Sequence, residues 1–238
     1  MQKIKLFILL IMLLSSCINK NSDKNEIKLT DYELNALDSI RTRFAGDVNY
    51  KIGSTTNNSG SLKSYLEIEF SNSKAIDILK DYKENVGSGI ALHYYTLLKN
   101  DSFRYDFIRM RIISKNKSIE RYISKTELQA VNDKLPYIEK IIKAINDEDY
   151  NWVHSNLNNE VLYKYNKEEI IKTIESRMNS YGRLKNYTVL GYNITQSSDN
   201  KSILHVIGQM FFQSKASAYS IDIDLNDEVI YFFDFSYE

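Results

Sequence analysis

The chain has 238 residues, of which 43% are hydrophobic, and it includes 18 Tyr and 10 Phe. Aromatic side chains bury large areas, so this composition supplies a core for one large domain or two ordinary ones. The 31 basic residues balance 31 acidic ones, which argues against a nucleic-acid partner, because such a partner calls for a clustered basic face. The single Cys excludes an internal disulfide.

The first segment of the chain carries a basic head and a short apolar run. Lys3 and Lys5 precede an uncharged apolar stretch over residues 6–14, and the small residues Ser15 and Ser16 follow it. This order is typical of a secretory leader with its cleavage point after the small residues. The nine apolar residues are too few to span a bilayer, because a spanning helix needs about 20.

Cys17 directly follows Leu14-Ser15-Ser16, and this motif resembles the lipobox of a bacterial lipoprotein signal peptide. In that family the cysteine is diacylated at sulfur and becomes the new N-terminus. The resemblance therefore implies a signal peptide over residues 1–16, a lipid on Cys17 and a location in the cell envelope, with the outer membrane as the expected site. An ordinary secretory signal with a coincidental cysteine is the alternative.

The segment after the leader is predicted to be a tether that leads into a helix. Residues 17–30 are polar and lack the apolar spacing that would fold them, so we expect them to be flexible. Residues 31–44 carry apolar side chains at helical spacing. These side chains are Leu34, Leu37, Ile40 and Phe44. The Gly-, Ser- and Asn-containing stretch 46–60 has room for a short strand before a loop.

A strand, a helix and a hairpin are predicted next. Residues 61–70 alternate between apolar and polar, which indicates a half-buried strand. The following helix is expected to begin at caps in residues 71–73 and to end near residue 98. Its Gly87 and Gly89 either break the helix or let it pack closely on the sheet. The last two strands of this module, 105–113 and 118–123, flank a polar turn.

Arginines and glutamates occur at matching positions of two predicted strands. Arg109 and Arg111 share one strand face and would form a modest basic patch if they were unpaired. Glu67 and Glu69 share a face of the strand expected to lie beside them. Opposite charges on adjacent strands attract, so cross-strand ion pairing is the favoured interpretation.

A domain boundary is predicted near Pro136. Ser124 and Glu127 fit a capping box that opens a helix, and Pro136 is expected to interrupt the chain. The predicted class is α+β, with a small N-terminal α/β layer over residues 31–133. A C-terminal domain of helices followed by an antiparallel sheet is expected over residues 134–238.

The C-terminal region is predicted to hold three helices and three or four strands. The helices begin at Pro136, near residue 150 and at Asn166, where Glu169 completes a capping box, and the third helix ends at Gly182. The strands are expected over residues 184–195, 202–213, 216–225 and 229–237.

This order of elements, with the acidic stretch 146–152 and the helix end 180–182, looks like the nuclear-transport-factor-2-like, cystatin-related class. In that class a curved sheet wraps the helices into a cone with a pocket. This chain departs from the class on the last strand, where aromatic residues replace the usual Trp. These residues are Tyr231, Phe232, Phe233 and Phe235.

Three histidines are candidates for chemistry near neutral pH. Strand alternation places His205, Gln209 and Phe211 on the same face of a strand. The resemblance to the cone-shaped class implies that one sheet face lines a ligand pocket. These three residues are therefore the candidate pocket. A solvent-facing strand side is the alternative. We expect His93 to pack on the sheet and His154 to lie at the surface or core edge.

Three aspartates on the last strands are weaker candidates. Asp222 and Asp224 share a strand face, where they would serve as an acid–base pair or a cation site. The favoured interpretation is that both are solvated. Asp234 lies among aromatic residues, so we expect it to pair with Arg183 or with a tyrosine hydroxyl.

The sequence contains no recognised catalytic, cofactor or metal motif. We therefore expect a non-enzymatic binding or accessory module of the cell envelope, attached to the membrane by the lipid on Cys17. An envelope protein or peptide is the expected partner. No nucleic acid, cofactor, metal or catalytic residue is expected. The alternative is an enzyme that acts on a small hydrophobic substrate in a pocket around His205.

Overall fold

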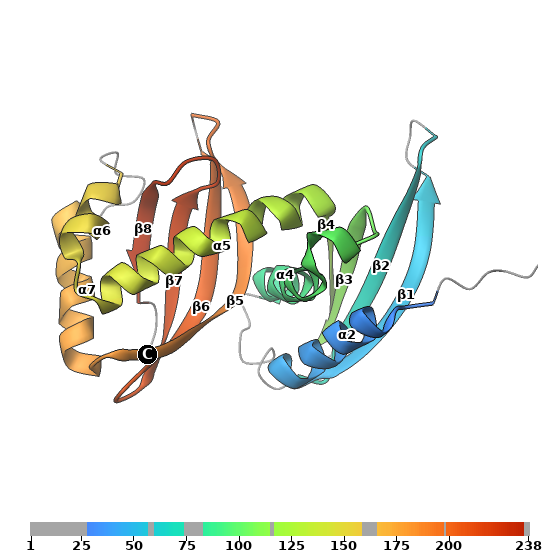
Figure 1. Ribbon diagram of the computed structural model, residues 1–238, viewed down its shortest axis with the longest axis horizontal. Coiled ribbons are helices and arrows are strands. Elements are labelled where there is room, and N and C mark those ends of the chain that lie inside the picture. The colour runs from blue at the N-terminus through green and yellow to red at the C-terminus, as the bar shows by residue number, and fades with distance from the viewer. Residues whose placement is uncertain are drawn as a thin grey trace, which may run out of the picture. The chain divides into compact units, whose positions relative to one another are not determined.

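The computed structural model describes residues 28–56, 60–73, 83–114, 117–158, 166–197 and 199–235. The predicted signal peptide, Cys17 and most of the predicted tether lie outside the described residues. The chain from Asp31 to Glu238 is one compact unit. Its described part contains five helices and two four-stranded sheets (Figure 1), which confirms the predicted α+β class.

The first sheet has the strand order β1-β2-β3-β4. Its strands are β1 (Asp47–Thr56), β2 (Leu62–Ser71), β3 (Phe107–Ser114) and β4 (Lys117–Ser124). Both outer pairs are antiparallel, whereas β2 and β3 are parallel, so a long crossover must join these two. Helix α4 (Lys83–Ser102) lies in that crossover. The predicted start of this helix falls in residues 74–82, outside the described residues.

Helices α2 (Asp31–Phe44) and α4 cover one face of the first sheet (Figure 1). Alternate residues of β2 and β3 bury apolar side chains under them, as the period of two requires. These side chains are Leu66, Ile68, Phe70, Ile108, Met110 and Ile112. Strand β1 pairs with β2 along ten residues. It is longer than its weak strand signal predicts, because pairing with β2 outweighs local preference.

Helix α4 continues through both of its glycines, so the close-packing alternative is confirmed. A Cβ atom added to Gly87 would lie 3.3 Å from Cγ of Met110 on β3. A Cβ atom added to Gly89 would lie 2.1 Å from the carbonyl oxygen of Leu190. The missing side chains therefore let the helix backbone approach both sheets.

Helix α5 (Lys125–Asn146) runs without a break through Pro136, and the predicted interruption there was wrong. Ser124 caps the helix as predicted, because its Oγ accepts a hydrogen bond from the amide of Glu127 at 3.0 Å. An interior proline removes one helical hydrogen bond, but buried apolar residues on both sides keep the helix together. These residues include Leu128, Val131, Ile138 and Ile141.

The predicted boundary between residues 133 and 134 therefore falls inside a helix and not in a linker. A linker would place few contacts across the boundary, whereas α5 carries the chain across it in one rigid element. The division into the modules 31–133 and 134–238 stays a prediction.

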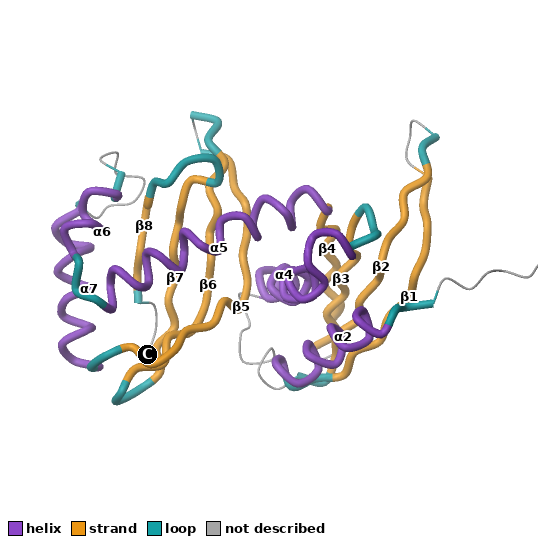
Figure 2. Tube along the Cα trace, viewed as in Figure 1, coloured by secondary structure: helices purple, strands orange, loops and turns teal. Residues whose placement is uncertain are grey.

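The second sheet is an antiparallel meander with the order β5-β6-β7-β8. Its strands are β5 (Leu184–Gln196), β6 (Ser202–Phe212), β7 (Ala216–Asp224) and β8 (Ile230–Asp234). Figure 2 shows these strands in orange and the loops between them in teal. Strand β8 is shorter than predicted, and residues 236–238 lie outside the described part of the chain.

Two helices precede this sheet, α6 (Tyr150–Asn156) and α7 (Lys167–Tyr181). The capping box of Asn166 and Glu169 is present at the start of α7, as predicted. Gly182 ends the helix with a φ of 77°, a left-handed conformation that glycine adopts at no steric cost.

The helices cover one face of the second sheet. Tyr181 of α7 packs edge-on against Phe212 of β6, with ring centroids 5.4 Å apart. Phe212 and its alternate neighbours on β6 therefore face the helices, whereas His205 and Gln209 lie on the opposite face. In the described residues, no helix combines the length and the apolar character that a bilayer crossing requires.

Candidate functional site

A cavity of about 500 Å³ lies where α4, α5 and β5 meet, beside the last turn of α2. This volume falls within the range of about 300–1,000 Å³ that is typical of small-molecule sites. Its apolar lining includes Leu92, Leu135, Ile138 and Val189. Its polar lining includes Arg43, His93, Thr96, Asn132, Glu139 and Thr188. We call it the Arg43 cavity.

The guanidinium of Arg43 contacts only neutral groups. Its Nη2 donates to the carbonyl oxygen of Val189 at 2.9 Å and to Oγ1 of Thr188, and its Nη1 donates to Nδ1 of His93 at 3.4 Å. No carboxylate of the described residues forms an ion pair with it. Burial lowers the pKa of Arg43, yet a guanidinium stays charged in proteins. The cavity therefore holds a cation that the protein does not neutralise.

His93 is neutral and both of its ring nitrogens are engaged. Its Nε2 lies 2.9 Å from Oγ of Ser39. Because arginine can only donate, Nδ1 must accept from Arg43, and the ring proton on Nε2 is then donated to Ser39. Burial, and next the charge of Arg43, lower the pKa of His93 to about 4. The ring of His93 packs edge-on against Phe44 of α2, and its packing on the sheet stays a prediction.

Helix α5 contributes acceptors to the same cavity. Glu139 is exposed and forms no hydrogen bond or ion pair with a described residue. Burial, and next the charge of Glu139, raise the pKa of Tyr187, so this carboxylate lies within electrostatic range of the phenol. In an α-helix the carbonyl of Asn132 would accept a hydrogen bond from the N–H of residue 136. That residue is Pro136, which has no N–H, so this carbonyl lacks its helical donor.

Side-chain donors hold α4 and β4 against β5 and so fix the cavity wall. Oγ of Ser88 donates to the carbonyl oxygen of Tyr192 at 2.8 Å. Nη1 of Arg121 donates to the same oxygen at 3.3 Å. Together with the bond from Arg43 to Val189, they satisfy carbonyl groups of β5, the outer strand of its sheet. Buried carbonyl groups need such partners.

The predicted His205 pocket has a different arrangement. His205 and Asp222 are register partners on β6 and β7, and Nδ1 of His205 lies 2.5 Å from Oδ1 of Asp222. Gln209 is four residues along the strand, about 13 Å away, so it does not converge with them. His205, Gln209 and Phe211 do not line the Arg43 cavity, nor a smaller one of about 170 Å³ beside α7 and β8. Their pocket role stays a prediction.

Asp222 and Asp224 are buried, with 2% and 3% of their surface exposed, so the prediction that they are solvated was wrong. Asp224 accepts hydrogen bonds from the amides of Asn226 and Asp227 and from Oη of Tyr231. The turn after β7 folds back over the carboxylate and satisfies it. Within the described ranges, no group of three or more potential ligands is arranged to hold a metal ion.

Asp234 and His154 each lie near a single residue of opposite charge. Burial raises the pKa of Asp234, and the charge of Arg177 opposes this shift. The basic group near Asp234 is therefore Arg177 and not the predicted Arg183. His154 lies at the surface, as expected, with Nε2 at 3.6 Å from Oε1 of Glu168.

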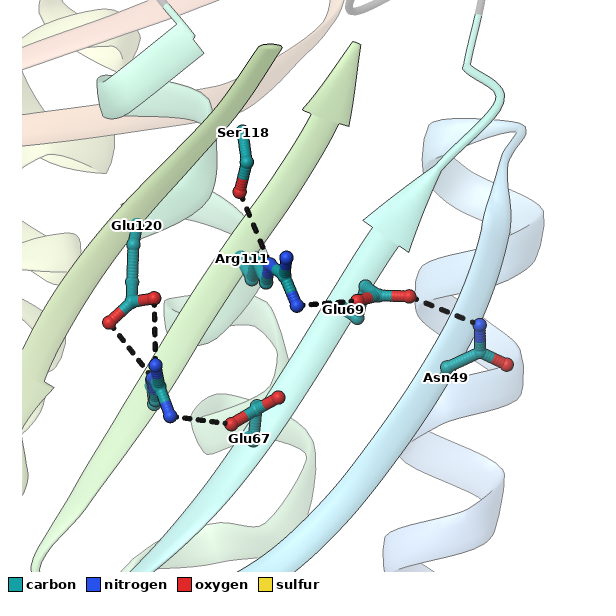
Figure 3. A network of polar contacts seen from close by, with 7 residues as sticks. Asn49, Glu67, Glu69, Arg111, Ser118 and Glu120 are labelled. Carbon is teal, nitrogen blue, oxygen red and sulfur yellow. Dashed lines mark hydrogen bonds and ion pairs between the residues drawn. The ribbon is translucent and has the colours of Figure 1, made fainter. Parts of the chain in front are cut away.

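The predicted cross-strand ion pairs are confirmed on the open face of the first sheet (Figure 3). Nη1 of Arg109 lies 3.0 Å from Oε2 of Glu67, and Nη1 of Arg111 lies 3.2 Å from Oε2 of Glu69. Arg109 also makes two hydrogen bonds of 2.9 Å to Glu120 on β4. This face is therefore not a free basic patch.

A scan against models of known protein families finds no match, and no curated protein sequence is similar. One solved structure with some likeness is that of Bd1075 from Bdellovibrio bacteriovorus. The match covers 79% of this chain and 75% of that chain, at 11% sequence identity and a TM-score of 0.35. A likeness at this TM-score does not bear on the function of the chain.

Sequence reasoning missed the charged residues of the Arg43 cavity. Arg43 and Glu139 are single charges on amphipathic helices, where a solvated role is the default expectation. The one available signal was Pro136, because a proline inside an apolar helical pattern leaves a carbonyl without its partner.

Proposed function

We propose that the chain is a lipid-anchored, non-enzymatic binding module of the bacterial cell envelope, with the Arg43 cavity as its ligand site. The observation that carries the proposal is the unneutralised guanidinium of Arg43 at the wall of a cavity of about 500 Å³. A cavity of this size with convergent polar groups beside apolar side chains is a common form of small-molecule site.

The polar groups of the cavity favour binding over catalysis. Ser39 and His93 form a serine–histidine contact, but its polarity is opposite to that of a hydrolase. In a catalytic triad a carboxylate at Nδ1 supports the imidazolium, and Nε2 accepts the serine proton. Here the cation of Arg43 occupies Nδ1, and the pKa of His93 is lowered to about 4. Such a histidine is too weak a base to activate Ser39 near neutral pH.

The anchor rests on the lipobox-like motif that ends in Cys17 and on the polar stretch 17–30 after it. A diacylated cysteine would hold the folded unit at a membrane leaflet, and two acyl chains suffice for stable attachment. The proposed location is the cell envelope, at the outer membrane.

The anchor is tested by fractionating cells that express the chain or its Cys17→Ser variant. We expect the natural chain in the membrane fraction and the variant in the soluble fraction. Mass spectrometry of the natural chain should find a diacylated Cys17 at its N-terminus. An unmodified cysteine, or equal membrane partition of both chains, would contradict the anchor.

The binding role is tested by a thermal-shift screen of small molecules against the natural chain in detergent. Thr96→Trp, which fills part of the cavity, serves as the blocked variant. We expect compounds that raise the Tm of the natural chain but not of the variant, and that are recovered unchanged after incubation. Conversion of a bound compound would instead indicate an enzyme.

A second candidate is an enzyme that uses His205. The hydrogen bond of 2.5 Å between His205 and the buried Asp222 favours it, because a buried acid that orients an imidazole is part of many hydrolytic sites. A compound that is converted, and that raises the Tm of Thr96→Trp as well as of the natural chain, should be turned over by the natural chain and not by His205→Gln. Turnover that survives this change would exclude His205 as its base.

A further inference from the structure

The geometry points to a zwitterion as the ligand of the Arg43 cavity, of the kind formed by an amino acid or short peptide with an apolar side chain. Its carboxylate would bind Arg43, and its ammonium would bind the α5 wall at Glu139 and Asn132. This inference rests on the proposed binding function and adds the class of ligand.

Arg43 has spare donors for a carboxylate. A guanidinium has five N–H groups, and three of those of Arg43 donate to Thr188, Val189 and His93. Two N–H groups remain without a partner among the described residues. These three bonds also fix the orientation of the guanidinium, so little side-chain freedom is lost when an anion binds. His93 is neutral and places no second positive charge beside it.

The α5 wall has spare acceptors for an ammonium. Glu139 is a carboxylate without a hydrogen bond or ion pair to a described residue, and it lines the same cavity as Arg43. The carbonyl of Asn132 lacks its helical donor because of Pro136. An ammonium group has three donors and no acceptor, so it matches a wall of this kind.

The two charges together disfavour ligands that carry charge of one sign alone. A multiply charged anion would be repelled by Glu139, and a simple cation would be repelled by Arg43. A ligand with one charge of each sign satisfies both walls. Between the charged groups, the lining of Leu92, Ile138 and Val189 favours an apolar side chain.

The test is isothermal titration calorimetry on the natural chain purified in detergent. Two zwitterions with different charge separation, L-leucine and L-leucyl-L-leucine, are titrated first. The tighter of them is then compared with its N-acetyl form, which keeps the carboxylate alone, and its amide, which keeps the ammonium alone. We expect at least one zwitterion to bind, and each blocked form to bind at least tenfold more weakly.

Two variants assign the charges to their walls. We expect Arg43→Gln to weaken binding of the zwitterion by about tenfold to a hundredfold, and Glu139→Gln to weaken it by about tenfold. Arg41→Gln on α2 and Asp133→Asn on α5 are the matched controls, and they should bind as the natural chain does. Because Glu139 is exposed, its variant is expected to fold.

Four outcomes would overturn the inference. A blocked form that binds as tightly as the zwitterion would do so, as would binding that is unaffected by Glu139→Gln. Failure of both zwitterions, while other compounds bind the natural chain and not Thr96→Trp, would overturn the ligand class but leave the binding function standing. Failure of every compound would remove both.

Discussion

Gly89 of α4 lies directly against the carbonyl oxygen of Leu190 on β5, so that a Cβ atom at this position would lie 2.1 Å from the oxygen. The contact is between two backbones, which leaves no flexible side chain to move aside. Gly87 lies two residues earlier on the same helix and approaches only side chains, because a Cβ atom there would lie 3.3 Å from Cγ of Met110 and 3.4 Å from Cδ1 of Ile112.

The two glycines therefore predict effects of alanine that differ in size. Gly89→Ala should lower the free energy of unfolding by more than about 2 kcal/mol, because overpacking forces the backbones apart. Gly87→Ala should stay within about 1 kcal/mol of the natural chain, because the gain in helix propensity offsets a small movement of Met110. Urea unfolding measures both. Equal effects of the two changes would show that the contact with Leu190 is not tight.

The depressed pKa of His93 predicts a dependence of stability on pH. The unfolded chain binds a proton at this histidine below about pH 6.5, whereas the folded chain does so only near pH 4. Between these values the unfolded state binds more protons, so stability falls as the pH is lowered. Relative to His93→Gln, the natural chain should lose at most about 3 kcal/mol between pH 7 and pH 4.

The measurement for His93 is the difference in unfolding free energy between the two chains at a series of pH values. Glutamine is a suitable reference because its amide can accept from Arg43 and donate to Ser39 without titrating. Carboxylates that titrate in the same window are common to both chains and cancel in the difference. A difference that stays constant with pH would contradict the assignment.

Two buried tyrosines predict different responses to loss of their hydroxyl groups. Oη of Tyr231 donates to Oδ2 of Asp224 at 3.1 Å, so Tyr231→Phe should cost about 1–2 kcal/mol. Oη of Tyr219 is buried and has no hydrogen-bond partner in the described part of the chain. Tyr219→Phe should therefore change stability by less than about 0.5 kcal/mol, or raise it. Thermal unfolding of both variants compares them, and a larger loss for Tyr219→Phe would refute the assignment.

The ion pair between Arg104 and Glu33 predicts a larger effect than the pairs on the open sheet face. Glu33 is 1% exposed, and it accepts hydrogen bonds from Nε and Nη2 of Arg104 at 3.0 and 2.9 Å. Arg104→Met leaves this carboxylate buried without its cation, so it should cost about 2–3 kcal/mol. Arg111→Met, at an exposed pair, should cost about 1 kcal/mol or less. Unfolding in urea, which carries no charge and does not screen ion pairs, measures the free energy of unfolding of both variants. Equal losses of stability would contradict the expectation.

The parts of the fold that local patterns determine were predictable from the sequence. Alternation in β2 and β3 placed Glu67 beside Arg109 and Glu69 beside Arg111, because charge complementarity and strand register select the same pairing. Helix caps were predictable because they are local. The side chains of Asn166 and Ser124 accept hydrogen bonds from amide groups only three residues away.

Features that depend on distant segments were not predictable. The burial of Asp222 depends on side chains of neighbouring strands, such as His205 of β6, which no local pattern reports. The Arg43 cavity joins residues from four elements whose contacts arise only in the folded chain. Pro136 is the instructive case, because its local preference for a break was outweighed by the apolar face of α5 on both sides of it.

The side-chain bonds along β5 have a consequence for self-association. Outer strands of sheets are templates on which a second molecule can add a strand, and such addition starts aggregation. Arg43, Ser88 and Arg121 already occupy the carbonyl groups of Val189 and Tyr192, so an incoming strand would have to displace three donors at once. The same contacts that shape the cavity therefore oppose the addition of a foreign strand to this part of the edge.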